Sequence, residues 1–327
     1  MQNFYPTIDK AIIEEIKKAN TIAIFGHTQP DGDCVMSQLA LSYIFQKMGK
    51  KIYLFNEGPF IRSDMKSYEP LFLTEVSDEI LSEEPLIVVA DCSSIDRPGK
   101  IFEKVAHLKR IVFDHHSSGS NFCEPELSYI VPSSVSTTLV IEQLRVALDI
   151  PLDETLSRYL YIGFCTDTGF YHFLNEVNAE QSLKIVTEYV HHGVVPYEIY
   201  DELNDGKTLT YYKTISHLID KVESLYDGQV LYTYQTLDED TGDTVSDVIY
   251  GQLLTIQDVK VVFFFKEKED KIVVGMRSKK NSGVDVGQFA SFFGGGGHKN
   301  ASGASLELPL DKAIEKVNQE IGKLLSK

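Results

Sequence analysis

The sequence predicts an α/β fold in which a larger parallel-sheet domain is followed by a smaller α+β domain. Short apolar runs alternate with longer stretches of helical spacing through the first half of the chain. These runs are continuously apolar rather than alternating, which is typical of parallel strands covered on both faces. A chain of 327 residues is also long enough to bury a core in each of two domains.

The first half of the chain contains short strands and longer helices. The stretch 34–49 has apolar residues at helical spacing and ends at Gly49, and the stretch 179–192 begins after Asn178 and ends before Gly193. The predicted strands are 21–25, 51–55, 86–90 and 110–113, and the predicted helices are 34–49, 135–147, 153–165 and 179–192. A succession of this kind favours a parallel sheet with helices on its faces.

The pattern changes around Val195 and Pro196. An amphipathic stretch at 208–224 predicts a connecting helix whose apolar face is formed by Leu209, Tyr212, Ile215, Ile219 and Val222. The segments that follow are strands at 229–235, 259–265, 271–276 and 302–308, helices at 245–256 and 284–293, and a C-terminal helix. We therefore expect a first domain at 1–195, a linker-helix region at 196–225 and a second domain at 226–327.

The composition favours a cytoplasmic globular protein without a membrane segment. No run approaches the roughly 18 apolar residues that a membrane helix needs, and the N-terminal residues lack a secretory-signal pattern. The cysteines form no C-x-x-C pair, which argues against a zinc knuckle or a disulfide framework. The net charge of −17 disfavours duplex DNA as a partner, because DNA-binding faces are basic, but it leaves short polyanions open.

Acidic residues and histidines follow the predicted strands of the first domain. His27, Asp31 and Asp33 follow the strand at 21–25, Asp91 follows 86–90, Asp114, His115 and His116 follow 110–113, and Asp167 follows the helix at 153–165. The carboxyl ends of parallel strands meet at one edge of a sheet, where ligands bind. A single aspartate after a strand is usually a helix cap or a turn residue. Four segments that bring the same chemistry to one edge predict a metal site instead.

The composition of this cluster favours two divalent cations. Crowded carboxylates repel one another unless a cation lies between them. Oxygen ligands with some imidazole suit Mn²⁺ better than Zn²⁺, and Mg²⁺, Fe²⁺ and Co²⁺ remain open as substitutes. The candidate ligands are too many for one ion and suit two ions roughly 3.5–4 Å apart.

Separate roles are predicted within the cluster. Asp91, on the middle strand, is the candidate bridging ligand. His115 is assigned to a metal and His116 to the substrate or to a position behind the ligands, because adjacent side chains point in different directions. Asp114 is expected to orient a neighbouring imidazole. Asp91, Asp114 and His116 are therefore the candidate catalytic residues.

A glycine run forms a second candidate site in "SFFGGGGHKNASG" (291–303). Without Cβ atoms, Gly294 to Gly297 can expose consecutive N–H groups to an oxyanion. His298 adds a donor, and Arg277 at a strand end can pair with a phosphate through two hydrogen bonds. The alternative is a flexible linker, but linkers are longer mixtures of Gly and Ser. The run therefore predicts an anion-binding loop.

The two clusters together predict a two-metal phosphoesterase. One domain would carry the catalysis, and the other would bind a phosphate. Hydroxide generated between the ions at neutral pH would attack phosphorus in line.

The motifs resemble those of the DHH phosphoesterase family. "DHH" at 114–116 resembles the motif that names the family, and "GHTQPDGD", "VVADCS" and "CTDTG" resemble its other metal-binding motifs in the expected order. "GMRS" and "GGGGHKNASGAS" resemble the DHHA1 substrate-binding domain. The resemblance extends from about Thr21 to Leu306, and the ordered set is far more specific than three letters alone.

The resemblance implies a manganese-dependent enzyme with a cleft between its domains. It assigns metal binding to His27, Asp31, Asp33, Asp91, His115 and Asp167, and substrate binding to Arg277, Ser278, Gly295, Gly296, Gly297 and His298. The compact build is similar to that of the nanoRNase A (NrnA-type) branch. Members of that branch degrade very short RNAs and linear dinucleotides and remove the 3′-phosphate of phosphoadenosine phosphate (pAp). We expect these molecules as the partners of the chain, with a homodimer left open.

Two positions depart from the family's pattern, and several functions remain open. Met36-Ser37 stands where relatives usually carry Gly-Ser, which can alter helix packing near the metals. His172 stands where an arginine is common, which can shift substrate preference. The alternative enzymes are a cyclic-dinucleotide phosphodiesterase, whose membrane-bound forms carry extra domains, and a pyrophosphatase-like enzyme, which has a different C-terminal domain. A non-catalytic nucleotide-binding module is the alternative from another class.

Overall fold

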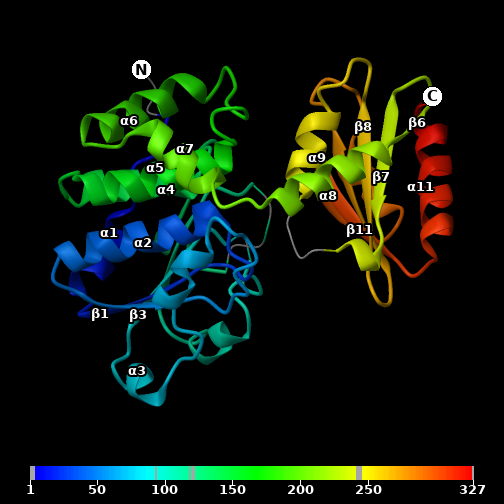
Figure 1. Cartoon of the computed structure of the whole chain (residues 1–327). Coiled ribbons are helices and arrows are strands. Elements are labelled where there is room, and N and C mark those ends of the chain that lie inside the picture. Colours follow the sequence, from blue (N-terminus) through cyan, green and yellow to red (C-terminus); the bar gives the residue numbers. More distant parts are fainter. Residues whose placement is uncertain (1–3, 93, 118, 120–121, 241–244, 326–327) are drawn as a thin grey trace. The chain divides into compact units, whose positions relative to one another are not determined.

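A computed structural model of the chain describes residues 4–92, 94–117, 119, 122–240 and 245–325. The chain divides into two compact units, Met1–Asp205 and Gly206–Lys327 (Figure 1). Within the described ranges, no helix is both long enough and apolar enough to cross a membrane.

The first unit is built on a five-stranded sheet in which every neighbouring pair is parallel, in the order β2-β1-β3-β4-β5. Its strands are β1 (Thr21–Phe25), β2 (Lys51–Phe55), β3 (Leu86–Ala90), β4 (Arg110–Asp114) and β5 (Ser128–Ile130). Ile22 and Ile24 face one apolar core, whereas Ala23 and Phe25 face a second core on the other side of the sheet. The continuous apolar runs thus arise because both faces of the sheet are covered.

Helices α2, α4 and α5 pack against one another on one face of this sheet. The α-helices of the first unit are α1 (Lys10–Lys18), α2 (Gly32–Lys47), α3 (Asp78–Ser82), α4 (Thr137–Ala147), α5 (Glu154–Thr168), α6 (Ala179–His191) and α7 (Pro196–Asn204). The short 3₁₀ helices are η1 (Lys66–Leu71), η2 (Lys100–Lys104) and η3 (Pro125–Leu127). The side chains of Asp31, Ser136 and Asp153 cap α2, α4 and α5, so each of these helices begins at a polar residue that accepts a backbone N–H.

The second unit contains a mixed six-stranded sheet in the order β10-β11-β9-β8-β7-β6. Its elements are β6 (Glu223–Leu225), β7 (Val230–Gln235), β8 (Val261–Glu267), β9 (Ile272–Ser278), β10 (Gly296–His298), β11 (Ala301–Leu306), α8 (Leu209–Asp220), η4 (Leu237–Glu239), α9 (Ser246–Leu253), α10 (Val286–Ser291) and α11 (Leu310–Leu325). The β7–β8 pair is parallel and the other pairs are antiparallel.

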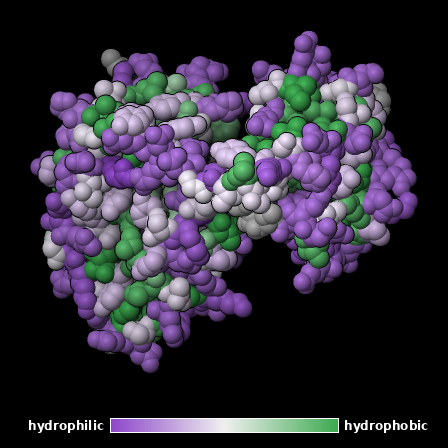
Figure 2. Space-filling view, in the orientation of Figure 1, coloured by the Kyte–Doolittle hydropathy of each residue, from purple (hydrophilic) through white to green (hydrophobic). Residues whose placement is uncertain are grey.

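Alternate residues of β8 fill two separate cores in the second unit. Val262 and Phe264 pack with α8 and α9, whereas Phe263 and Phe265 pack with α10 and α11. Figure 1 accordingly shows α8 and α9 on one side of the sheet and α11 on the other. In Figure 2, hydrophilic residues cover much of the visible surface of each unit, in keeping with the acidic composition.

The predicted fold class is confirmed, and several predicted details differ. The connecting helix predicted at 208–224 ends at Asp220, and Glu223–Leu225 forms the strand β6. The buried face of α8 is formed by Tyr211, Ile215 and Leu218, whereas Leu209 is 71% exposed and Tyr212 is 57% exposed. The apolar face predicted for this helix was therefore wrong at Leu209 and Tyr212, because the stretch carries apolar and aromatic residues on more than one side. Ile215 is buried as predicted, and Ile219 and Val222 are partly buried against the same core. The glycine run is not a free loop, since Gly296–His298 forms the edge strand β10.

Candidate metal centre

The candidate ligands gather where the strand order of the first sheet reverses. His27 follows β1, Asp91 follows β3, and Asp114 is the last residue of β4. These three strands are neighbours, and β3 lies at the centre of the sheet. In an open parallel sheet, the crevice for a ligand forms at the carboxyl ends of the strands on either side of the reversal, which here falls between β1 and β3.

His27 is buried and points its Nε2 atom at carboxylates. Its Nδ1 donates a hydrogen bond to the carbonyl oxygen of Thr28 at 2.9 Å. This leaves Nε2 3.5 Å from Asp91 Oδ2 and 3.8 Å from Asp31 Oδ1. Asp31 is also the N-cap of α2, where Oδ1 accepts from the backbone N–H of Cys34 at 3.0 Å. Asp31 therefore combines a helix-capping contact with a position beside the cluster.

Asp33 is held by the N-terminus of α4. Its two carboxylate oxygens accept from the backbone N–H groups of Thr137 at 2.6 Å and Thr138 at 3.0 Å. The N-terminus of a helix favours an anion because its N–H groups are unpaired and its dipole is positive there. Asp33 is 1% exposed, so these contacts also fix the direction of its side chain.

Asp91 lies at the centre of the cluster in a strained backbone conformation. Its φ of 60° is in the left-handed region, which residues other than glycine rarely adopt. Its Oδ1 accepts a hydrogen bond from Thr137 Oγ1 at 2.7 Å and lies 3.8 Å from His115 Nε2 and 3.7 Å from His116 Nδ1. Such strain is concentrated at functional sites, where the surrounding structure holds it in place.

Asp114 and the two histidines that follow it have different environments. Asp114 Oδ1 accepts from His116 Nδ1 at 2.7 Å and from the backbone N–H groups of His115 and His116. His115 instead donates from Nδ1 to the carbonyl oxygen of Ser134 at 3.3 Å, and its Nε2 lies 3.3 Å from Asp167 Oδ2. The hydrogen bond between His116 Nδ1 and Asp114 fixes the ring of His116, and the Nε2 atom takes no part in it.

The crowding of carboxylates and imidazoles shifts pKa values within the cluster. Burial, together with the nearby charge of Asp91, raises the pKa of Asp33 well above its usual range. Burial raises the pKa of Asp167 to about 7, although His115 opposes the shift. The pKa of Asp91 lies below its usual range, because contacts with His27, His115 and His116 outweigh the effect of burial. The hydrogen bond to Asp114 raises the pKa of His116 to about 9.

The donors fit divalent cations. Three overlapping groups bring ligand atoms within 4.8 Å of one another: His27 with Cys34 and Asp91, Asp91 with His115 and His116, and Asp33 with His115 and Asp167. Carboxylate oxygens and imidazole nitrogens are the donors that Mn²⁺ and related ions prefer. Asp91 and His115 each belong to two of the groups, so the arrangement suits two ions that share ligands.

Sequence reasoning missed several residues of this site. Thr137 contacts both Asp33 and Asp91. The sequence feature that could have indicated it is the segment Ser136-Thr137-Thr138, which is typical of the start of a helix. Gly163 allows α5 to approach, since a Cβ atom there would lie 2.9 Å from Asp33 Oδ1.

Cys34 is fully buried, and its thiol lies near His27 and Asp91. Of the two departures from the family's pattern, Met36 is fully buried in the core of the first unit, and His172 is exposed.

The candidate substrate residues of the second unit do not all lie together. Arg277 and His298 each lie opposite Ala301 in the sheet, which puts the three residues in one row. Ser278 lies on the opposite face of β9, where its buried Oγ donates to the carbonyl oxygen of Val284 and accepts from Asn300 Nδ2. Adjacent residues of a strand point to opposite faces, so Ser278 is separated from Arg277.

The predicted anion-binding loop is instead part of a strand and the turn before it. Gly296 and Gly297 pair with β11, so part of their backbone serves the sheet. Gly295 precedes the strand, and a Cβ atom there would lie 2.2 Å from the carbonyl oxygen of Gly303. Because β10 is an edge strand, the backbone groups on its outer side have no partner strand among the described residues.

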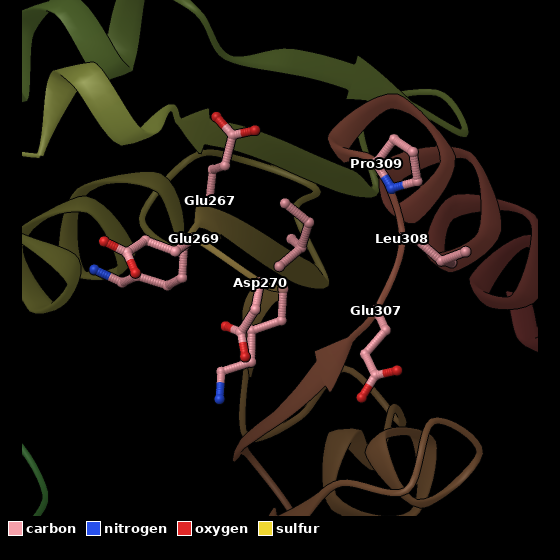
Figure 3. Close-up of a pocket in the computed structure, with 9 residues that line it drawn as sticks. Glu267, Glu269, Asp270, Glu307, Leu308 and Pro309 are labelled. Carbon is pink, nitrogen blue, oxygen red and sulfur yellow. The ribbon is translucent and has the colours of Figure 1, made fainter.

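A hollow of about 340 Å³ lies elsewhere in the second unit (Figure 3). It is lined by the β8–β9 turn and the end of β11, including Glu267, Glu269, Asp270 and Glu307. The hollow meets β9 at Ile272, five residues before Arg277, which corresponds to roughly 16 Å along a strand. Its acidic lining and this separation distinguish it from the row that contains Arg277.

Comparison with family models identifies both units. The DHH family, N-terminal domain, matches residues 21–164, and the DHHA1 domain matches residues 227–327. The chain is 27% identical over 321 residues to the bifunctional oligoribonuclease and PAP phosphatase NrnA of Thermus thermophilus, covering 97% of this chain and 94% of the relative. It is 27% identical over 303 residues to the protein of the same name from Bacillus subtilis, covering 90% and 92%.

The similarity extends to other relatives and to solved structures. The cyclic-di-AMP phosphodiesterase PdeA of Listeria monocytogenes is 22% identical, over 92% of this chain but only 47% of that protein. An exopolyphosphatase-related protein from Bacteroides fragilis shares the fold with a TM-score of 0.85, 21% identity and 97% coverage of both chains. Exonuclease RecJ bound to manganese gives a TM-score of 0.54 at 15% identity, with 97% of this chain and 95% of that chain covered. The chain therefore belongs to the DHH family of phosphoesterases and carries a C-terminal DHHA1 domain.

Proposed function

We propose that this protein is a manganese-dependent phosphoesterase that hydrolyses short oligoribonucleotides and linear dinucleotides and removes the 3′-phosphate of pAp. The observation that carries the proposal is the gathering of His27, Asp31, Asp33, Asp91, His115 and Asp167, with shared ligand positions, at one edge of the parallel sheet. The names of the Thermus and Bacillus relatives, which align over nearly the whole chain, support the choice of substrates.

These six residues would hold two divalent cations. The cations, when bound, would supply an activated water molecule at neutral pH and neutralise charge on the phosphate. Asp91 would serve both positions, and its membership in the group around His27 and in the group around His115 supports this role. The N–H groups of Thr137 and Thr138 would keep Asp33 oriented as a ligand.

Asp114 and His116 would serve the substrate rather than a metal. The hydrogen bond from His116 Nδ1 to Asp114 fixes the ring and holds its pKa at about 9. His116 is therefore protonated at neutral pH, and its Nε2–H can donate to a phosphate oxygen or to the leaving oxygen. Asp114 acts through His116 and is a positioning residue in this proposal.

Arg277 and His298 would bind a part of the substrate remote from the bond that breaks. Arg277 pairs with the small residue Ala301 on β11, and its guanidinium can form two hydrogen bonds with a phosphate. The net charge of −17 and the lack of an extended basic stretch disfavour long strands. Short substrates with one further phosphate or base suit this arrangement.

A substrate panel with purified protein and Mn²⁺ tests the proposal. The panel contains linear dinucleotides, short RNAs, pAp, cyclic di-AMP and pyrophosphate. Release of mononucleotides from dinucleotides and of phosphate from pAp is expected, and Asp33→Asn should abolish both.

The other outcomes of the panel contradict the proposal in distinct ways. Preferential turnover of cyclic di-AMP or of pyrophosphate would establish one of the alternative enzymes. Nucleotide binding without turnover of any substrate would instead indicate a non-catalytic module.

A further inference from the structure

Cys34 brings a thiol into the candidate metal centre. It lies in the first turn of α2, where its backbone N–H donates to Asp31 Oδ1 at 3.0 Å, and its side chain is fully buried. Its Sγ atom lies within 4.8 Å of a ring nitrogen of His27 and of a carboxylate oxygen of Asp91. The centre therefore contains a donor whose chemistry differs from that of the carboxylates and imidazoles around it.

The hydrogen bonds that this thiol makes with oxygen atoms are long. Sγ lies 4.0 Å from the carbonyl oxygen of His27 and 3.9 Å from Oε1 of Gln38. A thiol is a weak donor, and contacts of this length contribute little. Oε1 of Gln38 also accepts from Asn56 Nδ2 at 3.2 Å, so this oxygen keeps a partner when the thiol turns away. The sulfur can therefore exchange these contacts for a bond to a cation at little cost.

The backbone beside the thiol leaves room for the sulfur atom. Gly26 follows β1 directly and precedes His27. A Cβ atom on Gly26 would lie 2.5 Å from Cys34 Sγ, which is far closer than the two atoms can approach. The absence of a side chain at this position therefore allows the thiol to lie against the end of the strand that presents His27.

The donors around His27 match a thiophilic cation. They are the thiol of Cys34, a ring nitrogen of His27, a carboxylate oxygen of Asp91 and Asp31 Oδ1, which lies 3.8 Å from His27 Nε2. Zn²⁺ commonly binds four donors of these kinds, and a thiolate favours Zn²⁺ and softer ions over Mn²⁺ and Mg²⁺. Within the described ranges, the other two ligand groups contain no cysteine. The two ends of the metal centre therefore differ in chemistry.

We propose that Cys34 makes the position around His27 selective for a thiophilic cation of the Zn²⁺ class, which competes with Mn²⁺ there. The position formed by Asp33, His115 and Asp167 has oxygen and imidazole donors alone and keeps the preference for Mn²⁺. When the cation binds, a sulfur–metal bond forms and the proton of the thiol passes to solvent. The inference rests on the proposed function, because it assigns a metal preference to one half of the same centre.

Spectroscopy on the full-length, reduced and metal-free protein tests the inference. Cd²⁺ is added stepwise, and near-ultraviolet absorbance records the charge-transfer band that arises when sulfur binds cadmium. The parent protein should develop this band. Cys34→Ser nearly keeps the size of the side chain and removes the sulfur, so the band should be missing. Its Cd²⁺ affinity should fall at least about tenfold, since loss of a group that only orients a ligand already costs about 10- to 100-fold.

Cys92→Ser is the matched control. Cys92 is also buried, follows Asp91 directly and belongs to none of the three ligand groups among the described residues. This variant should show the band of the parent protein. Paramagnetic resonance of released Mn²⁺ measures the competition: Zn²⁺ should displace Mn²⁺ from the parent and from Cys92→Ser at a concentration about tenfold lower than from Cys34→Ser.

Melting temperatures of the metal-free variants separate metal binding from folding. They should match the parent value within a few degrees, because both substitutions are nearly isosteric. If Cys34→Ser does not fold, cadmium NMR of the parent protein takes its place. A resonance in the range of sulfur-bound cadmium is then expected, and a resonance typical of oxygen and nitrogen ligands alone would refute the inference.

Three results would overturn the inference. They are the absence of the charge-transfer band in the parent protein at saturating Cd²⁺, an equal band in Cys34→Ser, and equal losses of the band in Cys34→Ser and Cys92→Ser. Failure of the proposed function looks different: the band would depend on Cys34, yet the protein with Mn²⁺ would hydrolyse none of the phosphoesters. Turnover with Mn²⁺ in a protein that shows no band would refute the metal preference alone.

Discussion

Replacing Asp91 with asparagine should remove both metals at once. Asp91 is 2% exposed, and it belongs to the ligand group around His27 as well as to the group around His115. Asparagine has nearly the same shape and keeps an oxygen that accepts the 2.7 Å hydrogen bond from Thr137 Oγ1. The change therefore removes a charge and a ligand while leaving the packing in place.

The size of the effect follows from this dual position. Loss of a partner that only orients a ligand typically costs about 10- to 100-fold in metal affinity or activity. Asp91 is expected to be a ligand itself, and to serve two ions, so Asp91→Asn should lower dinucleotide kcat/KM by at least about 100-fold. The rise in Tm that Mn²⁺ gives the parent protein should shrink as well, because a cation bound only by the native state stabilises it.

The assay combines metal content, Tm with and without Mn²⁺, and dinucleotide turnover. Asp153→Asn is the control, because Asp153 caps α5 by accepting from the Leu156 N–H at 3.0 Å and belongs to none of the three ligand groups. It should lower Tm slightly and leave metal content and turnover unchanged. Two ions per chain and a near-normal rate in Asp91→Asn would refute the bridging assignment.

Four further predictions follow from the same geometry. Excess chelator followed by dialysis should abolish turnover and lower Tm, with recovery on addition of Mn²⁺; full activity without metal would exclude the two-metal site. The Tm of the metal-free protein should fall as pH rises from about 4 to 7, because the folded protein retains on Asp167, with its pKa of about 7, a proton that the unfolded chain has already lost. Asp167→Asn should flatten this profile, and an identical slope in the variant would contradict the assignment. Dinucleotides should be hydrolysed with a higher kcat/KM than long single strands, and comparable values would contradict the preference for short substrates. Arg277→Ala should reduce dinucleotide kcat/KM by roughly ten- to a hundredfold, the usual effect of losing a charged hydrogen bond. The same variant should hydrolyse a small phosphodiester at the parent rate. Equal losses on the two substrates would mean that Arg277 acts in catalysis or folding.

Local sequence patterns were sufficient to predict the fold class and the types of candidate ligand residue. Continuous apolar runs report burial on both faces of a strand, and the run before Asp91 indeed forms the fully buried β3. Because the carboxyl ends of parallel strands meet at one edge, the positions of His27, Asp91 and Asp114 relative to the strands already indicated that they lie together. The same alternation rule could have separated Ser278 from Arg277, which are adjacent in a strand and therefore face opposite sides.

The sequence by itself thus determined the fold class and the chemistry of the first cluster, since both depend on residue type and on spacing within single elements. Only the tertiary structure decided which distant groups orient these residues. Thr137, 104 positions after Asp33, donates its backbone N–H to that carboxylate, and no local period links the two. Tyr250 likewise meets Gly275 and Arg277 only because α9 packs across the sheet at the point where a glycine leaves room for its ring. Contacts of this kind depend on how elements pack, and packing is decided by the whole chain rather than by any one segment.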